Sequence, residues 1–358
     1  AILVQAILRQ GFVVCPRFGA SSGIRKANMA GAPSTLAAGC AYKLSSGYDM
    51  QMLGYGTFRS EPGVVRGSVL EALKAGYRHL DLAHVYGNEK EIGGALKEAF
   101  DTGVVKREDL FLVGKLWNSD HEVEIVPQAY QRSCDDLGVE YLDLYLIHFP
   151  VAVNHTGLDT PNCGPAALLG STPLIETWRA MEKLVDEGKV RSIGVSNFPL
   201  VLLHDMYNQA RIKPAVNQIE VHPFYVRSSL VNYCLSRNIA VTAHTPLGGG
   251  QLNSQQWAAA APMDSEVIKG IADAKGKAPA QVILRWLLQR NIIVIPKSLS
   301  QPRIVANANI FDFELTADEV SAIAGLDRYQ SAKTNPNPMS HFLDGDDGFE
   351  AGGTDIFD

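Results

Sequence analysis

The chain has 358 residues, of which 46% are hydrophobic and 20% charged, which is the composition of a folded protein and excludes wholesale disorder. Its net charge of −6 argues against nucleic acid as a partner, and the absence of a run of 18 apolar residues argues against a membrane span. The five cysteines are scattered and form no Cys-x-x-Cys pair, so we expect no zinc ribbon, no redox motif and no disulfide framework.

The first acidic residue is Asp49, and the segment before it is basic, with many alanines and several serines. This composition is typical of an organelle transit peptide, so we interpret residues 1–41 as a leader. We expect a plastid location on this basis, and otherwise a cytoplasmic one. The alternative is upstream sequence wrongly included by a gene model. Either interpretation leaves residues 1–41 outside the predicted fold.

From there to residue 330, short apolar runs alternate with amphipathic stretches. The runs predict strands at residues 53–57, 79–83, 110–114, 142–148, 191–195, 215–219, 239–243 and 292–295. The amphipathic stretches predict helices at residues 67–74, 89–100, 122–137, 174–187, 228–236, 265–275 and 316–326. The last helix opens with Thr316 and Glu319 in the spacing of a capping box.

Eight strands that alternate with helices predict an α/β fold, a (β/α)8 TIM barrel, over residues 42–330. A doubly wound open sheet is the alternative, but it requires Gly-x-Gly-x-x-Gly after the first strand. Here Gly54-Tyr55-Gly56 is followed by Thr57, Phe58 and Arg59, so that fingerprint is absent. Residues 331–358, rich in Gly, Asn, Pro and Asp, are expected to form a C-terminal loop or tail.

Nearly every predicted strand ends in a polar residue that is capable of catalysis or ligand binding. Because the carboxyl ends of the strands in a parallel barrel meet at one mouth, we interpret these residues as one site. Each of them alone has a simpler structural explanation, such as a core histidine or a capping aspartate. In chain order they are Asp81, Lys115, His148, Ser196, Asn197, Gln218, Glu220, His244, Lys297 and Ser298.

Asp81, Tyr86, Lys115 and His148 form a candidate acid–base unit. Free tyrosine has a pKa of about 10, and a lysine ammonium beside it favours the phenolate and lowers that pKa. Asp81 would hold Lys115 charged and in place, and His148 would orient a substrate carbonyl. The pair that begins at His121 lacks the second histidine of a zinc helix, so we expect no metal in the site.

Five segments resemble the signature of the aldo-keto reductases, in the family's order: residues 76–89 (GYRHLDLAHVYGNE), 114–118 (GKLWN), 146–150 (LIHFP), 193–198 (IGVSNF) and 295–298 (IPKS). The resemblance covers about residues 43–330. It implies a (β/α)8 barrel that reduces carbonyls with NADPH and a catalytic tetrad of Asp81, Tyr86, Lys115 and His148. By this resemblance, Tyr86 protonates the nascent alkoxide after hydride transfer from the nicotinamide.

The same resemblance implies a set of residues that bind NADPH. Ser196, Asn197 and Gln218 match the residues that hold the nicotinamide carboxamide. Lys297, Ser298 and Arg303 match those at the 2′-phosphate of NADP, where Lys and Arg supply charge-assisted hydrogen bonds. The remaining members of the cofactor-binding set are an adenine contact, Asn307, and three residues of the segment after the seventh strand, His244, Thr245 and Leu247.

Two positions depart from the family's common pattern. His244 stands where many members stack a tyrosine on the nicotinamide, and an imidazole ring can still stack there. Ala306 stands where many members place a Glu or Gln against the adenine, so we expect slightly weaker adenine binding.

Within the family, residues 244–249 (HTPLGG) and 115–121 (KLWNSDH) resemble the plant mannose-6-phosphate and aldose-6-phosphate reductases. We therefore expect a small sugar or sugar phosphate as substrate, its far end under the loop at residues 151–172 and the tail. Lys333 and Lys90 are candidate partners for a phosphate, while Gly87 stands where that subgroup has a lysine.

Three alternatives remain for the function. The chain also shares residues 148–150 (HFP) and 212–215 (IKPA) with fungal xylose reductases. A broad aldehyde reductase is the second alternative, because substrate choice lies in variable loops. The third is a non-enzymatic barrel such as a channel-associated β subunit, against which the intact tetrad argues.

Overall fold

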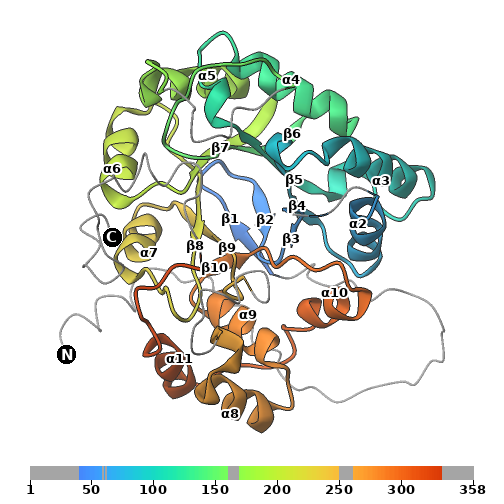
Figure 1. The fold of residues 1–358 in the computed structure, drawn as a ribbon, viewed down its shortest axis with the longest axis vertical. Helices are drawn as coiled ribbons and strands as arrows, with labels where there is room; N and C mark the ends of the chain where they lie inside the picture. The colour runs from blue at the N-terminus through green and yellow to red at the C-terminus, as the bar shows by residue number, and fades with distance from the viewer. Residues whose placement is uncertain (1–39, 59, 61–62, 160–168, 250–260, 333–358) are drawn as a thin grey trace.

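The structure is a computed structural model that describes residues 40–58, 60, 63–159, 169–249 and 261–332 (Figure 1). Residues 1–39 of the predicted leader and 333–358 of the predicted tail lie outside the described residues. No helix in the described part of the chain is long and apolar enough to cross a membrane.

Eight parallel strands form one sheet in the order β10-β9-β8-β7-β6-β5-β4-β3. The first and last strands meet at a parallel bridge between Leu53 and Val294, so the sheet closes on itself. The predicted (β/α)8 barrel is therefore confirmed, and every predicted strand overlaps an observed one. The strands are β3 (Tyr55–Gly56), β4 (His79–Asp81), β5 (Phe111–Leu116), β6 (Leu142–Ile147), β7 (Val190–Ser196), β8 (Val216–Glu220), β9 (Ala240–His244) and β10 (Ile292–Val294).

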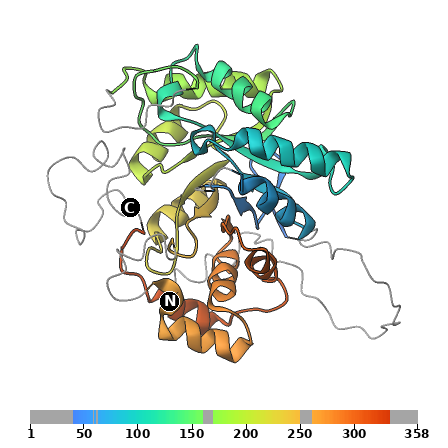
Figure 2. The same ribbon diagram turned by 45° about the vertical axis from the view of Figure 1, so that its right-hand side comes forward.

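Helices surround this sheet. They are α2 (Val65–Lys74), α3 (Glu89–Asp101), α4 (Val126–Leu137), α5 (Leu174–Asp186), α6 (Leu200–Gln209), α7 (Ser228–Ser236), α8 (Glu266–Lys275), α9 (Pro279–Gln289), α10 (Gln301–Ala308) and α11 (Ala317–Ala324). Figure 1 shows α8, α9 and α11 on one side of the barrel and α4 and α5 on the opposite side, and Figure 2 shows the same helices from another direction. The short 3-10 turns that matter below are η1 (His84–Tyr86) and η3 (Asn118–Asp120).

The predicted helices form because each has one apolar stripe that faces the strands. The indole ring of Trp178 on α5, for example, is fully buried in this layer. The capping box before α11 is also present, since the amide of Glu319 donates to Thr316 Oγ1 at 3.2 Å and the amide of Thr316 donates to Glu319 Oε2 at 2.7 Å.

Three helices, α6, α9 and α10, were not predicted. In α9 the residues from Gln281 to Leu288 are all buried, but the polar residues Gln281, Arg285 and Gln289 recur every four residues, so its sequence carries a helical period that the prediction overlooked. Helix α6 buries only Leu203 and Met206, and Val201 in its first turn is 52% exposed. Helix α10 has eight residues, with a proline at its second position.

An antiparallel hairpin of β1 (Ala41–Lys43) and β2 (Asp49–Gln51) precedes the barrel. It meets the starts of the barrel strands, because Gln51 O lies 3.1 Å from the Nδ1 of His79, the first residue of β4. Its Leu44 and Met50 side chains are buried. The hairpin therefore covers the end of the barrel opposite to the mouth, and it begins at the last residue of the predicted leader.

Candidate active site

The polar residues that were expected to share a site occupy the carboxyl ends of the strands. Since the strands are parallel, these ends lie at one mouth of the barrel. Asp81, Ser196, Glu220 and His244 are the last residues of β4, β7, β8 and β9. Lys115 and Gln218 lie near the ends of β5 and β8, and the residues directly beyond β6 and β7 are His148 and Asn197.

Lys115 is the centre of the tetrad. Its Nζ atom donates to Asp81 Oδ2 at 2.7 Å, to the backbone oxygen of Leu82 at 2.9 Å and to the hydroxyl of Tyr86 at 3.2 Å. Because an ammonium has three donors, these contacts use all of them and fix Nζ in position. Lys115 is 1% exposed, and among the largest side chains of the described residues that are less than 2% exposed it alone is charged.

Burial and charge act in opposite directions on this pair. Burial raises the pKa of Tyr86 above its ordinary value, and the Lys115 ammonium opposes this only in part. Burial alone would lower the pKa of Lys115, but the carboxylate of Asp81 and the phenol of Tyr86 reverse the direction, so the pKa is raised. The site therefore holds a charged lysine beside a protonated tyrosine. The sequence analysis had expected the lysine to dominate and to lower the tyrosine pKa.

A tight turn presents Tyr86 to the mouth. The 3-10 turn η1 follows β4 and ends at Gly87, whose φ of 70° lies in the left-handed region that glycine adopts without strain. The backbone conformation of the turn thus explains why a glycine occupies position 87.

Aromatic side chains form the wall around Tyr86 and His148, and sequence reasoning missed them. The Tyr86 ring lies 4.9 Å from that of Phe58 and 5.8 Å from that of His148, measured between ring centroids. The His148 ring also meets Trp117 edge-on at 5.1 Å and stacks on Phe149 at 5.2 Å. Phe58 is 51% exposed, so an apolar ring borders the mouth. The sequence feature that could have indicated these aromatic residues is their position one or two residues after the ends of strands β3, β5 and β6.

A hydrogen-bonded chain connects the tetrad to the expected nicotinamide contacts. The side-chain amide of Gln218 donates to Asp81 Oδ1 at 2.7 Å. The hydroxyl of Ser196 donates to the backbone oxygen of Gln218 at 2.9 Å, and the amide of Asn197 donates to Ser196 Oγ at 3.0 Å and to the backbone oxygen of His148 at 2.9 Å. One network thus positions residues from four strands.

Two residues of this region have unusual backbone conformations. Asn197 has φ of 60°, and Thr245, which follows β9, has φ of 53°. A left-handed conformation is tolerated by Asn but is an outlier for a β-branched residue, and such outliers gather at functional sites. His244 lies between them: its Nε2 donates to Asn197 Oδ1 at 3.1 Å, and its Nδ1 is 3.1 Å from Thr245 Oγ1.

The residues expected at the adenosine half of the cofactor lie on the connection from β10 to α10 and on α10 itself. Lys297 and Ser298 follow β10, and the hydroxyl of Tyr55 donates to the backbone oxygen of Ser298 at 2.6 Å. Arg303, in the first turn of α10, is exposed, whereas Asn307 is buried. Leu247 lies in the turn after β9 and is half-buried.

The loop after β6 is fastened to the segment after β5. The amide of Val153 donates to the backbone oxygen of Asn118 at 2.9 Å, and His155 Nδ1 donates to that of Ser119 at 2.9 Å. Arg132 on α4 bonds the backbone oxygen of Leu158. The first part of the predicted substrate loop is therefore held in place, while residues 160–168 lie outside the described part.

Of the two lysines proposed as phosphate partners, the structure describes only Lys90. Lys90 Nζ lies 3.7 Å from Asp136 Oδ1, so it already pairs with a carboxylate of α4. This weakens its candidacy, because the sequence could not show the partner across two helices. Lys333 lies outside the described residues.

Comparison with known proteins assigns a family to this site. The chain is 42% identical over 294 residues to an NADP-dependent D-sorbitol-6-phosphate dehydrogenase of Malus domestica, covering 80% of this chain and 93% of that one. It is 44% identical over 296 residues to an NAD(P)H-dependent D-xylose reductase of Scheffersomyces stipitis, with coverages of 80% and 93%. The solved aldose reductase of Schistosoma japonicum superposes with a TM-score of 0.77 at 40% identity, covering 84% of this chain and 96% of that one. The aldo/keto reductase family model matches residues 53–328, and the chain belongs to this family of oxidoreductases.

Proposed function

We propose that this protein uses NADPH to reduce the open-chain aldehyde of an aldose 6-phosphate, of the mannose 6-phosphate kind, to the alditol phosphate. The observation that carries the reductase part is the buried Lys115 ammonium 3.2 Å from the hydroxyl of Tyr86 and 2.7 Å from Asp81. This arrangement supports the proposal that Tyr86 is a fixed proton donor at the mouth of the barrel, beside His148.

The residues at the mouth fit a nicotinamide cofactor. Ser196, Asn197 and Gln218 offer a hydroxyl and two amides suited to a carboxamide, and they are held by the network described above. Lys297 and Arg303 supply positive charge suited to the 2′-phosphate of NADP. The Malus and Scheffersomyces relatives carry NADP or NAD(P)H in their names. When bound, NADPH supplies the hydride for carbonyl reduction.

The chain's own residues supply the proton and the orientation. Tyr86 donates its phenolic proton to the oxygen of the carbonyl as negative charge develops there. Lys115 stabilises the phenolate that remains, and Asp81 keeps Lys115 charged and in place. His148 hydrogen-bonds the carbonyl oxygen and fixes its position. Phe58 and Trp117 supply apolar surface beside Tyr86 and His148.

The sugar-phosphate part of the proposal has its own support. It draws on the segments shared with plant aldose-6-phosphate reductases and on the Malus relative, which is named for a sugar phosphate. The competing candidate is a xylose reductase, because the Scheffersomyces relative is 44% identical over a similar length.

The test compares kcat/KM for mannose 6-phosphate and glucose 6-phosphate with kcat/KM for mannose and xylose, all with NADPH. We expect a preference of about tenfold or more for the phosphates, equal to about 1.4 kcal/mol of differential transition-state binding. Equal or better use of xylose would reject the sugar phosphate and favour the xylose reductase. No reduction of any aldehyde would reject the reductase itself.

A further inference from the structure

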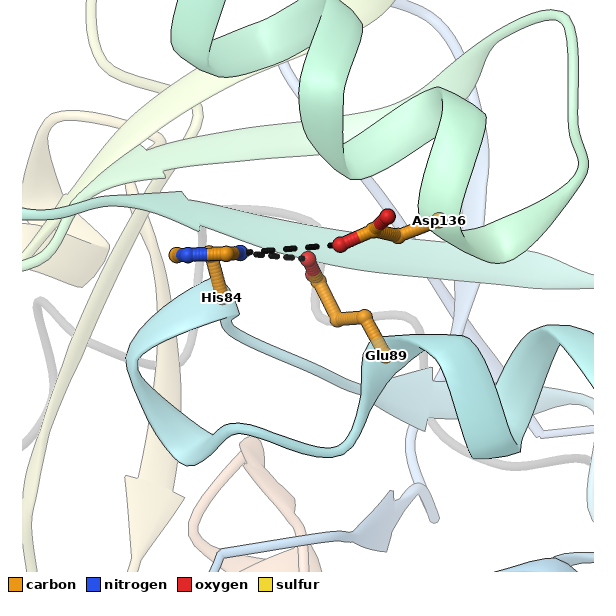
Figure 3. Close-up of side chains that lie close together, drawn as sticks. All are labelled: His84, Glu89 and Asp136. Carbon is orange, nitrogen blue, oxygen red and sulfur yellow. Dashed lines mark ion pairs between the residues drawn. The ribbon is translucent and has the colours of Figure 1, made fainter. Parts of the chain in front are cut away.

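A second group of ligand-type side chains lies next to the tetrad but is not part of it. It consists of His84 in η1, Glu89 in the first turn of α3 and Asp136 in the last turn of α4. Figure 3 shows the carboxylates of Glu89 and Asp136 directed at the His84 ring. One atom from each of the three side chains lies within 4.8 Å of the others.

Glu89 is the unusual member of this group. Its residue is 3% exposed, yet both carboxylate oxygens are buried and accept no hydrogen bond from the described residues. A buried carboxylate without partners is strongly unfavourable, so such groups are normally paired, hydrogen-bonded or bound to a metal. The start of α3 favours the negative charge, but a helix end alone leaves the oxygens without a partner.

An ion pair with histidine does not account for the spacing. A protonated imidazole that bonded a carboxylate would bring the two atoms to about 2.7–2.9 Å. His84 Nδ1 instead lies 3.6 Å from Glu89 Oε2 and 3.8 Å from Asp136 Oδ2, nearly midway between the two acids. Ligands at about 2.1 Å from a tetrahedral metal ion are about 3.4 Å from one another. The two distances from His84 are therefore near this ligand spacing, and all three ligand atoms lie within 4.8 Å of one another.

We infer that His84, Glu89 and Asp136 bind a divalent transition metal ion, with Zn²⁺ as the favoured ion. One imidazole and two carboxylates suit zinc, whereas Ca²⁺ and Mg²⁺ prefer six or more oxygen ligands. The side chains of His84 and Asp136 are 13% and 16% exposed, so solvent reaches the site and supplies a fourth ligand. Lys90, whose side chain is 80% exposed, lies near Asp136 and competes weakly with the ion.

The inferred ion would brace the part of the chain that carries the proton donor. Tyr86 lies two residues beyond His84 in the same 3-10 turn, and the two acids come from separate helices. A metal bound here ties η1 to α3 and α4. The site is thus a structural support for the Tyr86 turn and takes no part in hydride or proton transfer.

The experiment titrates Zn²⁺, and separately Co²⁺, into the chelator-stripped full chain and follows heat, the visible absorption of Co²⁺ and the unfolding temperature. We expect one tight equivalent, the intense visible bands of four-coordinate Co²⁺ without thiolate charge-transfer bands, and a raised unfolding temperature. Asp136→Asn should weaken binding at least tenfold, and Glu89→Gln should do the same. Lys90→Met should tighten it, because it removes a competing positive charge.

The matched control is Asp135→Asn, which makes the same change on the neighbouring exposed residue of α4. It should bind Zn²⁺ like the unchanged chain. If Glu89→Gln fails to fold, Asp136→Asn decides alone, because Asp136 is partly exposed. The inference is overturned if the unchanged chain shows no saturable site, or if Asp136→Asn and Asp135→Asn bind equally. None of the three readouts uses enzyme activity, so failure here is distinct from failure of the proposed function.

Discussion

The proton of Tyr86 is held by two influences of opposite sign. Burial favours the neutral phenol and prevails, so the pKa is raised, while the ammonium of Lys115 limits the rise. In the proposed mechanism Tyr86 is the general acid, which has to be protonated before it reacts and has to release its proton during the reaction. Burial meets the first requirement at neutral pH, and Lys115 meets the second by stabilising the phenolate.

Removing either partner should therefore lower the rate. Tyr86→Phe keeps the ring but has no proton to give, so we expect carbonyl reduction to fall at least about 100-fold while NADPH still binds. Lys115→Met should cause similar damage, because the phenolate loses its stabilising charge and the Tyr86 pKa rises further. Steady-state rates and cofactor fluorescence titrations measure both effects. Near-normal turnover in Tyr86→Phe would take this role away from Tyr86.

The positions of single site residues were largely predictable, but their partners were not. Asp81, Lys115 and His148 were predicted as strand-end residues because the polar residue after an apolar run marks where a barrel strand ends. The contact of Gln218 with Asp81 joins residues 137 positions apart, and no local pattern contains it. Phe58 and Trp117 were missed because an aromatic residue after a strand equally suits the core.

Helix α10 and the segment before it carry the proposed phosphate contacts. Replacing both Lys297 and Arg303 with alanine should weaken NADPH binding by tenfold or more and NADH binding much less, because only NADPH has the 2′-phosphate. Dissociation constants for the two cofactors test this. A control with Lys97→Ala and Lys183→Ala removes the same charge elsewhere on the surface. Equal losses for NADPH and NADH would show that the two residues act on another part of the cofactor.

Strand and helix prediction succeeded where elements were amphipathic or apolar runs bounded by turn residues. The hairpin of β1 and β2 was missed because each strand has three residues, too few for an alternating pattern. Helix α9 was missed although its polar residues Gln281, Arg285 and Gln289 recur with the helical period, so a local pattern was present there and was overlooked.

The chain as a whole should tolerate the loss of its first 41 residues. A protein that starts at Tyr42 keeps two of the three hairpin pairs, Tyr42 with Met50 and Lys43 with Asp49, and loses the pair of the exposed Ala41 with Gln51. We expect it to fold and reduce carbonyls like the full chain, with a slightly lower unfolding temperature.

The proposed leader can be tested separately as a targeting signal. A fluorescent protein that carries residues 1–48 should enter plastids or mitochondria, because the segment is basic and contains no acidic residue. The fluorescent protein alone is the control. Purely cytosolic fluorescence would favour the gene-model explanation of this segment.

The closure of the barrel has a mechanical consequence. Strand β3 has two residues, and around Leu53 the join to the last strand consists of hydrogen bonds from Gly54 to Val294, from Val294 to Met52 and from Gly56 to Pro296. The neighbouring pair β5 and β6 runs six residues in each strand. The ring is thus closed along one short edge, where an opening fluctuation has fewer bonds to break than between β5 and β6. The segment with Lys297 and Ser298 starts at this edge, so a ligand bound there would stabilise the closure of the barrel between its first and last strands.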